Sequence, residues 1–177
     1  MHWLNEPPAW SEEDGVLRLT TASGTDFWRT THYGFVRDDG HFGHRPVSGD
    51  FTARVRIEGA YRDQYDQAGL MVRLDAETWM KCGIEFVDGR QWASAVITRG
   101  LSDWSVAPLD PAPAQLWVEV RRTAEAVEVA YGADVPDRLL RLGALTTERD
   151  LQVGVMAASP EGGGFEVALH DFAVEPR

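Results

Sequence analysis

Apolar and polar residues alternate with a period of two along most of the chain. Phe51, Ala53, Val55 and Ile57, for example, are each separated by one polar residue. Because successive side chains of a strand point to opposite faces, this pattern predicts strands that are apolar on one side only. The same alternation recurs in the segments 67–74, 79–87, 91–99, 116–121, 127–131, 151–157 and 165–169.

Turn residues separate these segments. Asp38-Asp39-Gly40, Asp88-Gly89-Arg90 and the glycines at 162–164 are residue types that tolerate a positive φ. Asp88-Gly89 divides segments 79–87 and 91–99, which predicts a hairpin. Only residues 137–145 are compatible with a helical turn. About a dozen strands without a helical layer predict an all-β sandwich of two antiparallel sheets, formed as a single domain over residues 1–177.

The strand predicted at 79–87 has one polar and aromatic side. Its even-numbered residues are apolar and are expected to face the core, so Trp79, Lys81, Gly83 and Glu85 share the opposite face. Gly83 would leave a gap between the two charged side chains where a ligand could approach. If the other strands are neighbours, this outer face also collects Gln67, Arg73, Ser94, Thr98, Glu119 and Arg121.

Two loops add aromatic rings flanked by short polar groups. They are Tyr65-Asp66-Gln67, before one strand, and Ser102-Asp103-Trp104-Ser105, after another. An aromatic ring beside hydrogen-bonding groups suits stacking on a sugar ring. We therefore expect the ligand-binding residues to be Gln67, Arg73, Trp79, Lys81, Glu85, Ser94, Thr98, Asp103, Trp104 and Arg121. The alternative is that the charged groups form ion pairs and the tryptophans cover sheet edges.

Charge and composition exclude several classes of partner. Seventeen basic and 28 acidic residues among 177 give a net charge of −11, which would repel a nucleic acid. The sequence has neither a basic amphipathic stretch nor an apolar run of about 20 residues, so no membrane association is expected. With no signal peptide and one cysteine, Cys82, a cytoplasmic location without disulfides is predicted.

Signals for catalysis and for metal binding are weak. Sandwich glycosidases need two carboxylates near the scissile bond. Here the central strand carries only Glu85, with Lys81 where a second carboxylate would be expected. His41 and His44 do not repeat on one strand face, and no cofactor motif is present, so neither a metal site nor a cofactor is predicted. An enzyme that uses Glu85 as an acid or base, with Lys81 tuning its pKa, remains an alternative.

Several segments resemble the family named for regulation of enolase protein 1. They are Asp26-Phe27-Trp28, the run 66–73, the run 79–85, Ser102-Asp103-Trp104-Ser105 and the run 153–160, so the resemblance spans nearly the whole chain. It implies a concanavalin A-like jelly roll, in which two curved antiparallel sheets form a concave groove. The family has no catalytic motif that can be carried over to this sequence.

These observations lead to one expected function and two alternatives. We expect a non-catalytic carbohydrate-binding or carbohydrate-sensing module with a concave polar and aromatic groove. Its ligand would be a carbohydrate or another small polar molecule. The first alternative is a protein–protein adaptor that regulates an enzyme of sugar metabolism, as the family name suggests. The second is a sugar-active enzyme that uses Glu85.

Overall fold

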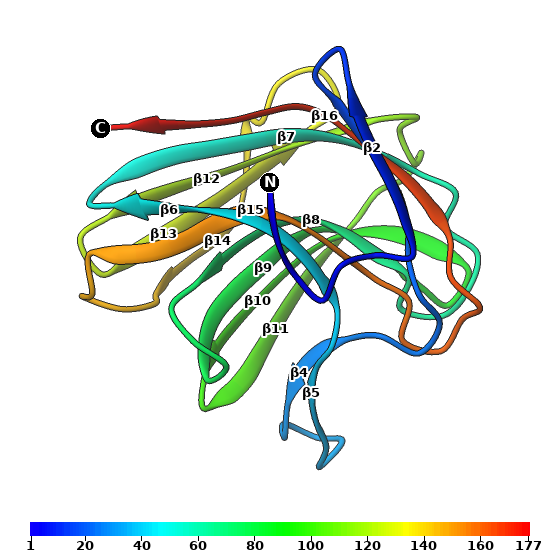
Figure 1. Cartoon of the computed structure of the whole chain (residues 1–177), viewed down its shortest axis with the longest axis horizontal. Coiled ribbons are helices and arrows are strands. Elements are labelled where there is room, and N and C mark those ends of the chain that lie inside the picture. The colour runs from blue at the N-terminus through cyan, green and yellow to red at the C-terminus, as the bar shows by residue number, and fades with distance from the viewer.

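The computed structural model describes residues 1–177 as two seven-stranded antiparallel sheets packed face to face, with a two-stranded arm at one end (Figure 1). The front sheet has the strand order β1-β6-β15-β8-β9-β10-β11, and the back sheet has the order β14-β13-β12-β7-β16-β3-β2. The strands are β1 (His2–Leu4), β2 (Ala9–Glu13), β3 (Val16–Thr20), β4 (Phe27–Arg29), β5 (Val36–Asp38), β6 (His41–Ser48), β7 (Phe51–Gly59), β8 (Gln67–Arg73), β9 (Thr78–Val87), β10 (Arg90–Arg99), β11 (Leu101–Pro108), β12 (Leu116–Thr123), β13 (Ala126–Gly132), β14 (Arg138–Ala144), β15 (Asp150–Ala158) and β16 (Glu166–Pro176).

The predicted alternation defines the main core between the two sheets. On β9, Met80, Cys82 and Ile84 are buried in this core. The inward residues of β7, from Phe51 to Ile57, pack against them from the back sheet. The strand parity read from the sequence is therefore confirmed, and Lys81 and Glu85 lie on the other side of the front sheet.

The predicted hairpin is also confirmed. β9 and β10 pair in register from Arg90↔Val87 to Arg99↔Thr78. Asp88 and Gly89 form the turn with φ values of 50° and 76°. The segment 137–145, which was compatible with a helical turn, instead contains the edge strand β14, which pairs with β13. No helix in the chain is long and apolar enough to cross a membrane.

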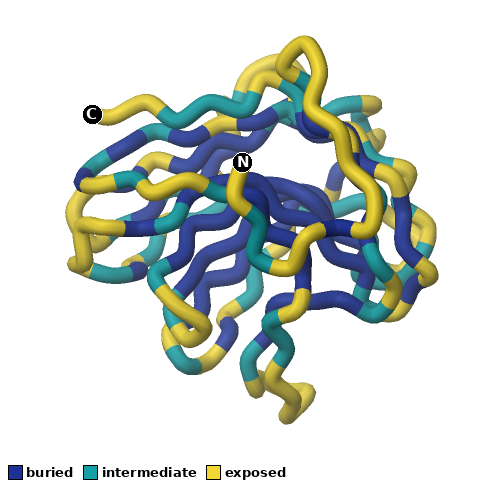
Figure 2. Tube along the Cα trace, viewed as in Figure 1, coloured by how far each residue is buried: buried dark blue, intermediate teal, exposed yellow.

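The arm, which comprises β4, β5 and the turn between them, lies against the outer face of the front sheet. Figure 1 shows it at the end of the sheet where β9, β10 and β11 lie, and Figure 2 shows that its tip is exposed. Phe27 and Trp28 from the arm pack on Met71, Trp79 and other apolar residues of the outer face to form a second, smaller core. The front sheet is therefore apolar on parts of both faces.

Hydrogen bonds fix the arm to the sheet at several points. The guanidinium of Arg73 donates to both carboxylate oxygens of Asp38 at 2.7 and 2.8 Å. The backbone N–H of Arg29 donates to Ser102 Oγ at 2.9 Å, and its side chain pairs with Glu77. Lys81 Nζ donates to the backbone carbonyl of Phe27 at 2.7 Å. These contacts hold the arm in one position over the sheet.

The location of Cys82 gives a first testable prediction. Its thiol is buried in the main core, and burial raises its pKa, so the reactive thiolate is strongly disfavoured. We expect the native protein to react with a thiol reagent such as DTNB far more slowly than the urea-unfolded protein. Rapid labelling under native conditions would contradict the placement of β9.

Candidate functional site

A pocket of about 170 Å³ lies between the arm and the outer face of the front sheet. Polar and charged side chains of Asp26, Gln67, Lys81 and Glu85 form its floor. Five aromatic side chains form its wall, and Arg37, Pro160 and Glu161 complete the lining. The wall residues are Trp28, Tyr33, Phe35, Tyr65 and Trp104. We call this site the arm pocket.

Lys81 and Asp26 form a buried ion pair at the floor. Lys81 Nζ lies 3.3 Å from Asp26 Oδ1, and both side chains are almost fully buried. The same oxygen accepts hydrogen bonds from the backbone N–H of Phe27 at 2.7 Å and from Gln67 Nε2 at 3.4 Å. The second oxygen, Asp26 Oδ2, has no partner within the protein. This oxygen is not fully buried, and Asp26 lines the pocket.

Glu85 is held from one side by two neutral donors. Its Oε2 accepts hydrogen bonds from Ser94 Oγ at 2.7 Å and from Trp104 Nε1 at 2.8 Å. Its Oε1 has no protein partner and, like Asp26 Oδ2, keeps access to solvent. Burial raises the pKa of this carboxyl, because the charged form loses hydration, while the nearby Lys81 opposes the shift. The floor thus offers two free carboxylate oxygens.

The aromatic wall is connected across the pocket mouth. Tyr33 stacks on Phe35 with ring centroids 5.6 Å apart and contacts Trp28 edge-on at 5.5 Å. The hydroxyls of Tyr33 and Tyr65 lie 3.1 Å apart, which joins the arm to the loop before β8. That hydrogen bond, together with burial and the charges of Glu85 and Glu161, raises the pKa of Tyr33 to about 12. The Tyr33 hydroxyl therefore remains protonated at neutral pH.

Half of the predicted binding residues meet at this place. Gln67, Lys81 and Glu85 line the pocket, as does Trp104. Ser94 lies behind Glu85 and donates to it. Their role in binding stays a prediction. The expected concave groove takes the form of a small pocket, because the arm packs over part of this face.

Three further predicted residues are buried, although they were expected on the exposed face: Trp79, Arg73 and Thr98. Trp79 has 0% exposure because the arm packs over it, so it cannot stack on a ligand. Arg73 is occupied by its paired contact with Asp38. Thr98 is buried and shares a 2.8 Å hydrogen bond with Ser102, the residue that anchors the arm.

Asp103 and Arg121 were also expected at the site and lie elsewhere. Asp103 points to the opposite side of β11 from Trp104 and pairs with Arg141 of β14 at 2.6 Å. Arg121 is on β12, which belongs to the back sheet, and pairs with Glu119 and Glu128. Sequence alternation gives the side of a strand but not the sheet to which the strand belongs.

Gly83 has a packing role that the sequence did not reveal. It lies opposite Gly69 where β8 and β9 approach each other closely. A Cβ atom added at Gly83 would lie 2.0 Å from the carbonyl oxygen of Ala68. The glycine is required by the backbone of the neighbouring strand, so it is not evidence for a gap that admits a ligand.

The pocket also contains residues that sequence reasoning missed. They are Asp26, Trp28, Tyr33 and Phe35, which all lie in or just before the arm. The signal available in the sequence was the aromatic density of the segment 27–35, which is unusual for a loop of this length. Nothing in that segment indicated which face it would cover.

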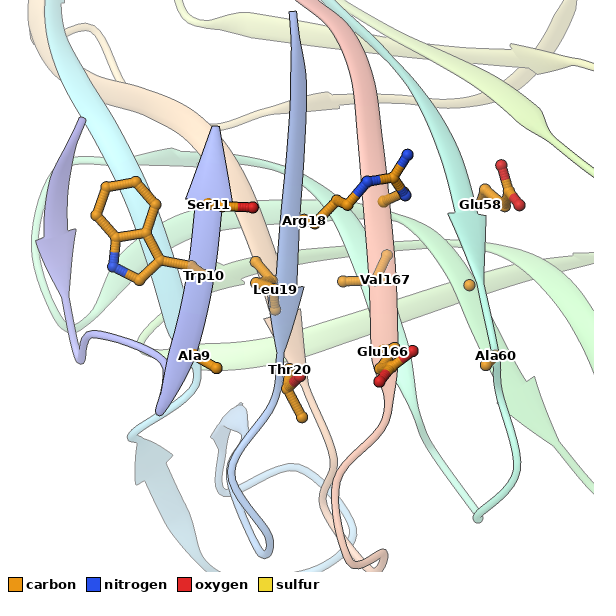
Figure 3. Close-up of a pocket in the computed structure, with 12 residues that line it drawn as sticks. Ala9, Trp10, Ser11, Arg18, Leu19, Thr20, Glu58, Ala60, Glu166 and Val167 are labelled. Atoms are coloured by element: carbon orange, nitrogen blue, oxygen red, sulfur yellow. The ribbon is translucent and has the colours of Figure 1, made fainter. Parts of the chain in front are cut away.

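A larger hollow of about 570 Å³ lies on the outer face of the back sheet, across β2, β3, β16 and β7 (Figure 3). Small residues such as Ala9 and Ala60 create it, and charged side chains such as Arg18 and Glu166 border it. Those two charged side chains are exposed, and Glu58 already pairs with His170 and Gln115. No buried charge faces this hollow, which has the character of a hydrated sheet surface.

No group of three or more His, Cys, Asp and Glu side chains in the structure is arranged to hold a metal ion. His41 instead joins two loops. Its Nδ1 lies 2.7 Å from the carbonyl oxygen of Asn5, and its Nε2 accepts a hydrogen bond from the N–H of Ala22 at 2.9 Å. Burial lowers the pKa of His41, so the ring is neutral at neutral pH.

A family model with the description "Protein of unknown function (DUF1349)" matches residues 3–177. The chain belongs to the DUF1349 family. This DUF1349 chain is 40% identical over 173 residues to Regulation of enolase protein 1 from Saccharomyces cerevisiae. The aligned region covers 97% of this chain and 87% of that protein. The family resemblance found in the sequence is thereby confirmed.

Solved structures establish the fold of the DUF1349 chain. A functionally unknown protein from Saccharomyces cerevisiae aligns with a TM-score of 0.94 at 39% identity, covering 99% of this chain and 96% of that chain. The carbohydrate-binding module CBM66 from Bacillus subtilis aligns with a TM-score of 0.62 at 12% identity, covering 98% of this chain and 94% of that chain. The predicted all-β jelly-roll sandwich is confirmed.

Proposed function

We propose that this DUF1349 chain is a non-catalytic carbohydrate-binding or carbohydrate-sensing module that holds one small sugar unit in the arm pocket. The observation that carries the proposal is the pair of free carboxylate oxygens, Asp26 Oδ2 and Glu85 Oε1, below an aromatic wall. An ionised carboxylate only accepts hydrogen bonds, so it suits the hydroxyl groups of a sugar. The aromatic rings suit the C–H face of the same molecule.

The size of the pocket restricts the ligand to a single small unit. Its volume is about 170 Å³, whereas pockets for drug-sized ligands usually measure roughly 300–1,000 Å³. The arm closes the outer face on one side and prevents a long chain from lying across the strands. A monosaccharide, or the end of a longer chain, meets this restriction.

The charges of the pocket disfavour an anionic ligand. Its two cations, Lys81 and Arg37, are already paired with Asp26 and Asp39. Glu85 and the exposed Glu161 add negative charge to the lining, and the whole chain carries a net charge of −11. A sugar phosphate or uronate would meet repulsion without a free cation to bind it. We therefore favour a sugar without negative charge.

The names of one relative and one structural neighbour support parts of this proposal. Regulation of enolase protein 1 is named for a regulatory role, and CBM66 is named as a carbohydrate-binding module. A module that senses a sugar and reports it to another protein would unite both functions. We propose that residues 1–177 act as one such domain and that it works in the cytoplasm.

The adaptor function is favoured by a separate observation at the tip of the arm. Tyr33 and Phe35 are each 43% exposed, and Val36 is 52% exposed. An exposed cluster of large apolar side chains is typical of a surface that contacts another protein. Because Tyr33 and Phe35 also line the pocket, a bound sugar would contact the same residues as the partner.

The enzymatic alternative gains a second carboxylate from the structure. Asp26 and Glu85 line the same pocket, so two carboxylates of the kind that glycoside hydrolysis uses share one site, although Asp26 lies outside β9. Turnover of a panel of aryl glycosides by the wild type, lost in Glu85→Gln, would support an enzyme and contradict the non-catalytic part of the proposal.

Trp104 provides the direct test of sugar binding. Binding of neutral monosaccharides, namely glucose, galactose, mannose, xylose and fructose, is measured by isothermal titration calorimetry. For any sugar that binds, Trp104→Ala should weaken the affinity at least about tenfold, equivalent to about 1.4 kcal/mol, because it removes a ring from the wall and a hydrogen bond from Glu85.

Trp117→Ala is the matched control. It removes a half-buried indole from the back sheet, outside the arm pocket, and should leave the affinity unchanged. The proposal fails if no sugar of the panel or of a glycan array binds the wild type. It also fails if Trp104→Ala binds as well as Trp117→Ala.

A further inference from the structure

Glu85 is a buried carboxylate that forms no salt bridge. Its residue is only 6% exposed, yet no Lys, Arg or His nitrogen forms a salt bridge with it. Its two partners, the hydroxyl of Ser94 and the indole N–H of Trp104, are neutral, and both bind Oε2. Buried acidic side chains in folded proteins are almost always paired with a cation. The positive charge that would pair with Glu85 is therefore expected on the ligand.

The protein has no nearby cation free to take this place. Lys81, on the same face of β9, is held by Asp26 Oδ1 at 3.3 Å and by the carbonyl of Phe27 at 2.7 Å. Arg37 is bound to the carboxylate of Asp39 and to the carbonyl of Gly24. Glu161, the remaining charged residue of the lining, adds a further negative charge. With Glu85 ionised, the pocket lining carries more negative than positive charge.

The aromatic wall favours the same kind of ligand group. Five rings line a pocket that has two free carboxylate oxygens at its floor. The faces of aromatic rings attract a desolvated cation, and this attraction is largest for Trp and Tyr, which make up four of the five rings. A hydroxyl group would gain a hydrogen bond from Glu85 but no comparable attraction from the rings. An ammonium group would gain from both.

We propose that the sugar bound in the arm pocket is an amino sugar whose protonated amine contacts Oε1 of Glu85. This rests on the proposed carbohydrate-binding function and adds the class of sugar. The amine would donate to the free oxygen, and the opposite side of the carboxylate would stay fixed by Ser94 and Trp104. The sugar ring would pack on the aromatic wall, and its hydroxyls would reach Asp26 Oδ2.

Matched pairs of sugars test this inference. We compare glucosamine with glucose, galactosamine with galactose and mannosamine with mannose by calorimetry at a pH where the amine is protonated. In at least one pair, the amino sugar should bind at least about tenfold more tightly. Its N-acetyl derivative should lose this gain, because acetylation removes the positive charge.

Two variants separate a specific contact from general attraction to an acidic protein. Glu85→Gln keeps an oxygen for Ser94 and Trp104 but removes the charge, and it should reduce the preference for the amine to about twofold or less. Asp103→Asn removes one negative charge outside the pocket, where the carboxylate pairs with Arg141, and should keep the full preference.

Each outcome bears on a different statement. If neutral and amino sugars bind the wild type equally, the amino-sugar inference is overturned and the carbohydrate-binding proposal stands. A preference for the amine that survives in Glu85→Gln also overturns the inference. If no member of any pair binds, the inference is overturned, and the carbohydrate-binding proposal fails with it only when no sugar of the panel or the glycan array binds either.

Discussion

Replacing Trp79 by alanine should lower the free energy of unfolding by about 3–5 kcal/mol, the usual range for truncation of a fully buried tryptophan. Its indole has 0% exposure and lies between the front sheet and the arm, with its ring centroid 6.2 Å from that of Phe27. Urea unfolding monitored by circular dichroism measures the change. The substitution should weaken the packing of the second core, which holds the arm on the front sheet. The arm should therefore become sensitive to proteolysis at urea concentrations where the wild type is intact.

Trp79→Phe is the control for this prediction. It keeps an aromatic ring in the second core and removes an indole N–H that has no hydrogen-bond partner. The loss of stability should therefore be much smaller than in Trp79→Ala. If Trp79→Ala were as stable as the wild type, the arm would not be packed on the sheet. Trp79 would then be the exposed stacking residue that the sequence suggested.

The main sandwich was predictable because its strands can be identified from the alternation of neighbouring residues in the sequence. Period-two alternation on β9 assigns Met80, Cys82 and Ile84 to one side and Lys81 and Glu85 to the other, whatever the rest of the chain does. The hairpin at Asp88–Gly89 is equally local. Alternation does not identify which strands share a sheet, and for this reason Arg121 was placed on the wrong one.

The arm was not predictable, because its position depends on contacts between distant residues. Asp26 meets Lys81 across 55 positions in the sequence, and Asp38 meets Arg73 across 35. The sequence of the polar face did indicate that this face is covered. Met71 and Val96 lie on the same outward side as Trp79, and so much apolar surface beside charged groups indicates that another segment covers it. Half of the predicted residues therefore meet at the arm pocket, where their role in binding stays a prediction, but the face was wrongly expected to be exposed.

Replacing Lys81 by methionine should have a comparably large effect on stability. Methionine keeps most of the side-chain volume, so the change removes mainly the ammonium charge. Asp26 would then be buried without its cation, and Glu85 would lose the only nearby positive charge that lowers its pKa. Breaking a buried ion pair by removing one partner usually costs about 3–5 kcal/mol. We expect a loss of that size in urea unfolding at neutral pH.

The double variant Lys81→Met/Asp26→Asn tests whether charge is the cause. It removes both members of the pair, so it should recover much of the stability that Lys81→Met loses, and the effects of the two substitutions should not be additive.

The pH dependence of stability gives a second check. The pKa of Glu85 in the folded protein lies above its ordinary value of 4.5, and removing Lys81 should raise it further. A carboxyl whose folded pKa is raised favours the folded state below its ordinary pKa, and this advantage is lost as the pH rises through the folded pKa. The difference in stability between wild type and Lys81→Met should therefore shrink as the pH falls from neutral toward 4.5. If the difference is independent of pH and the double variant is no more stable than Lys81→Met, Lys81 acts through packing. Asp26 and Glu85 would then not form the charged floor on which the proposed site depends.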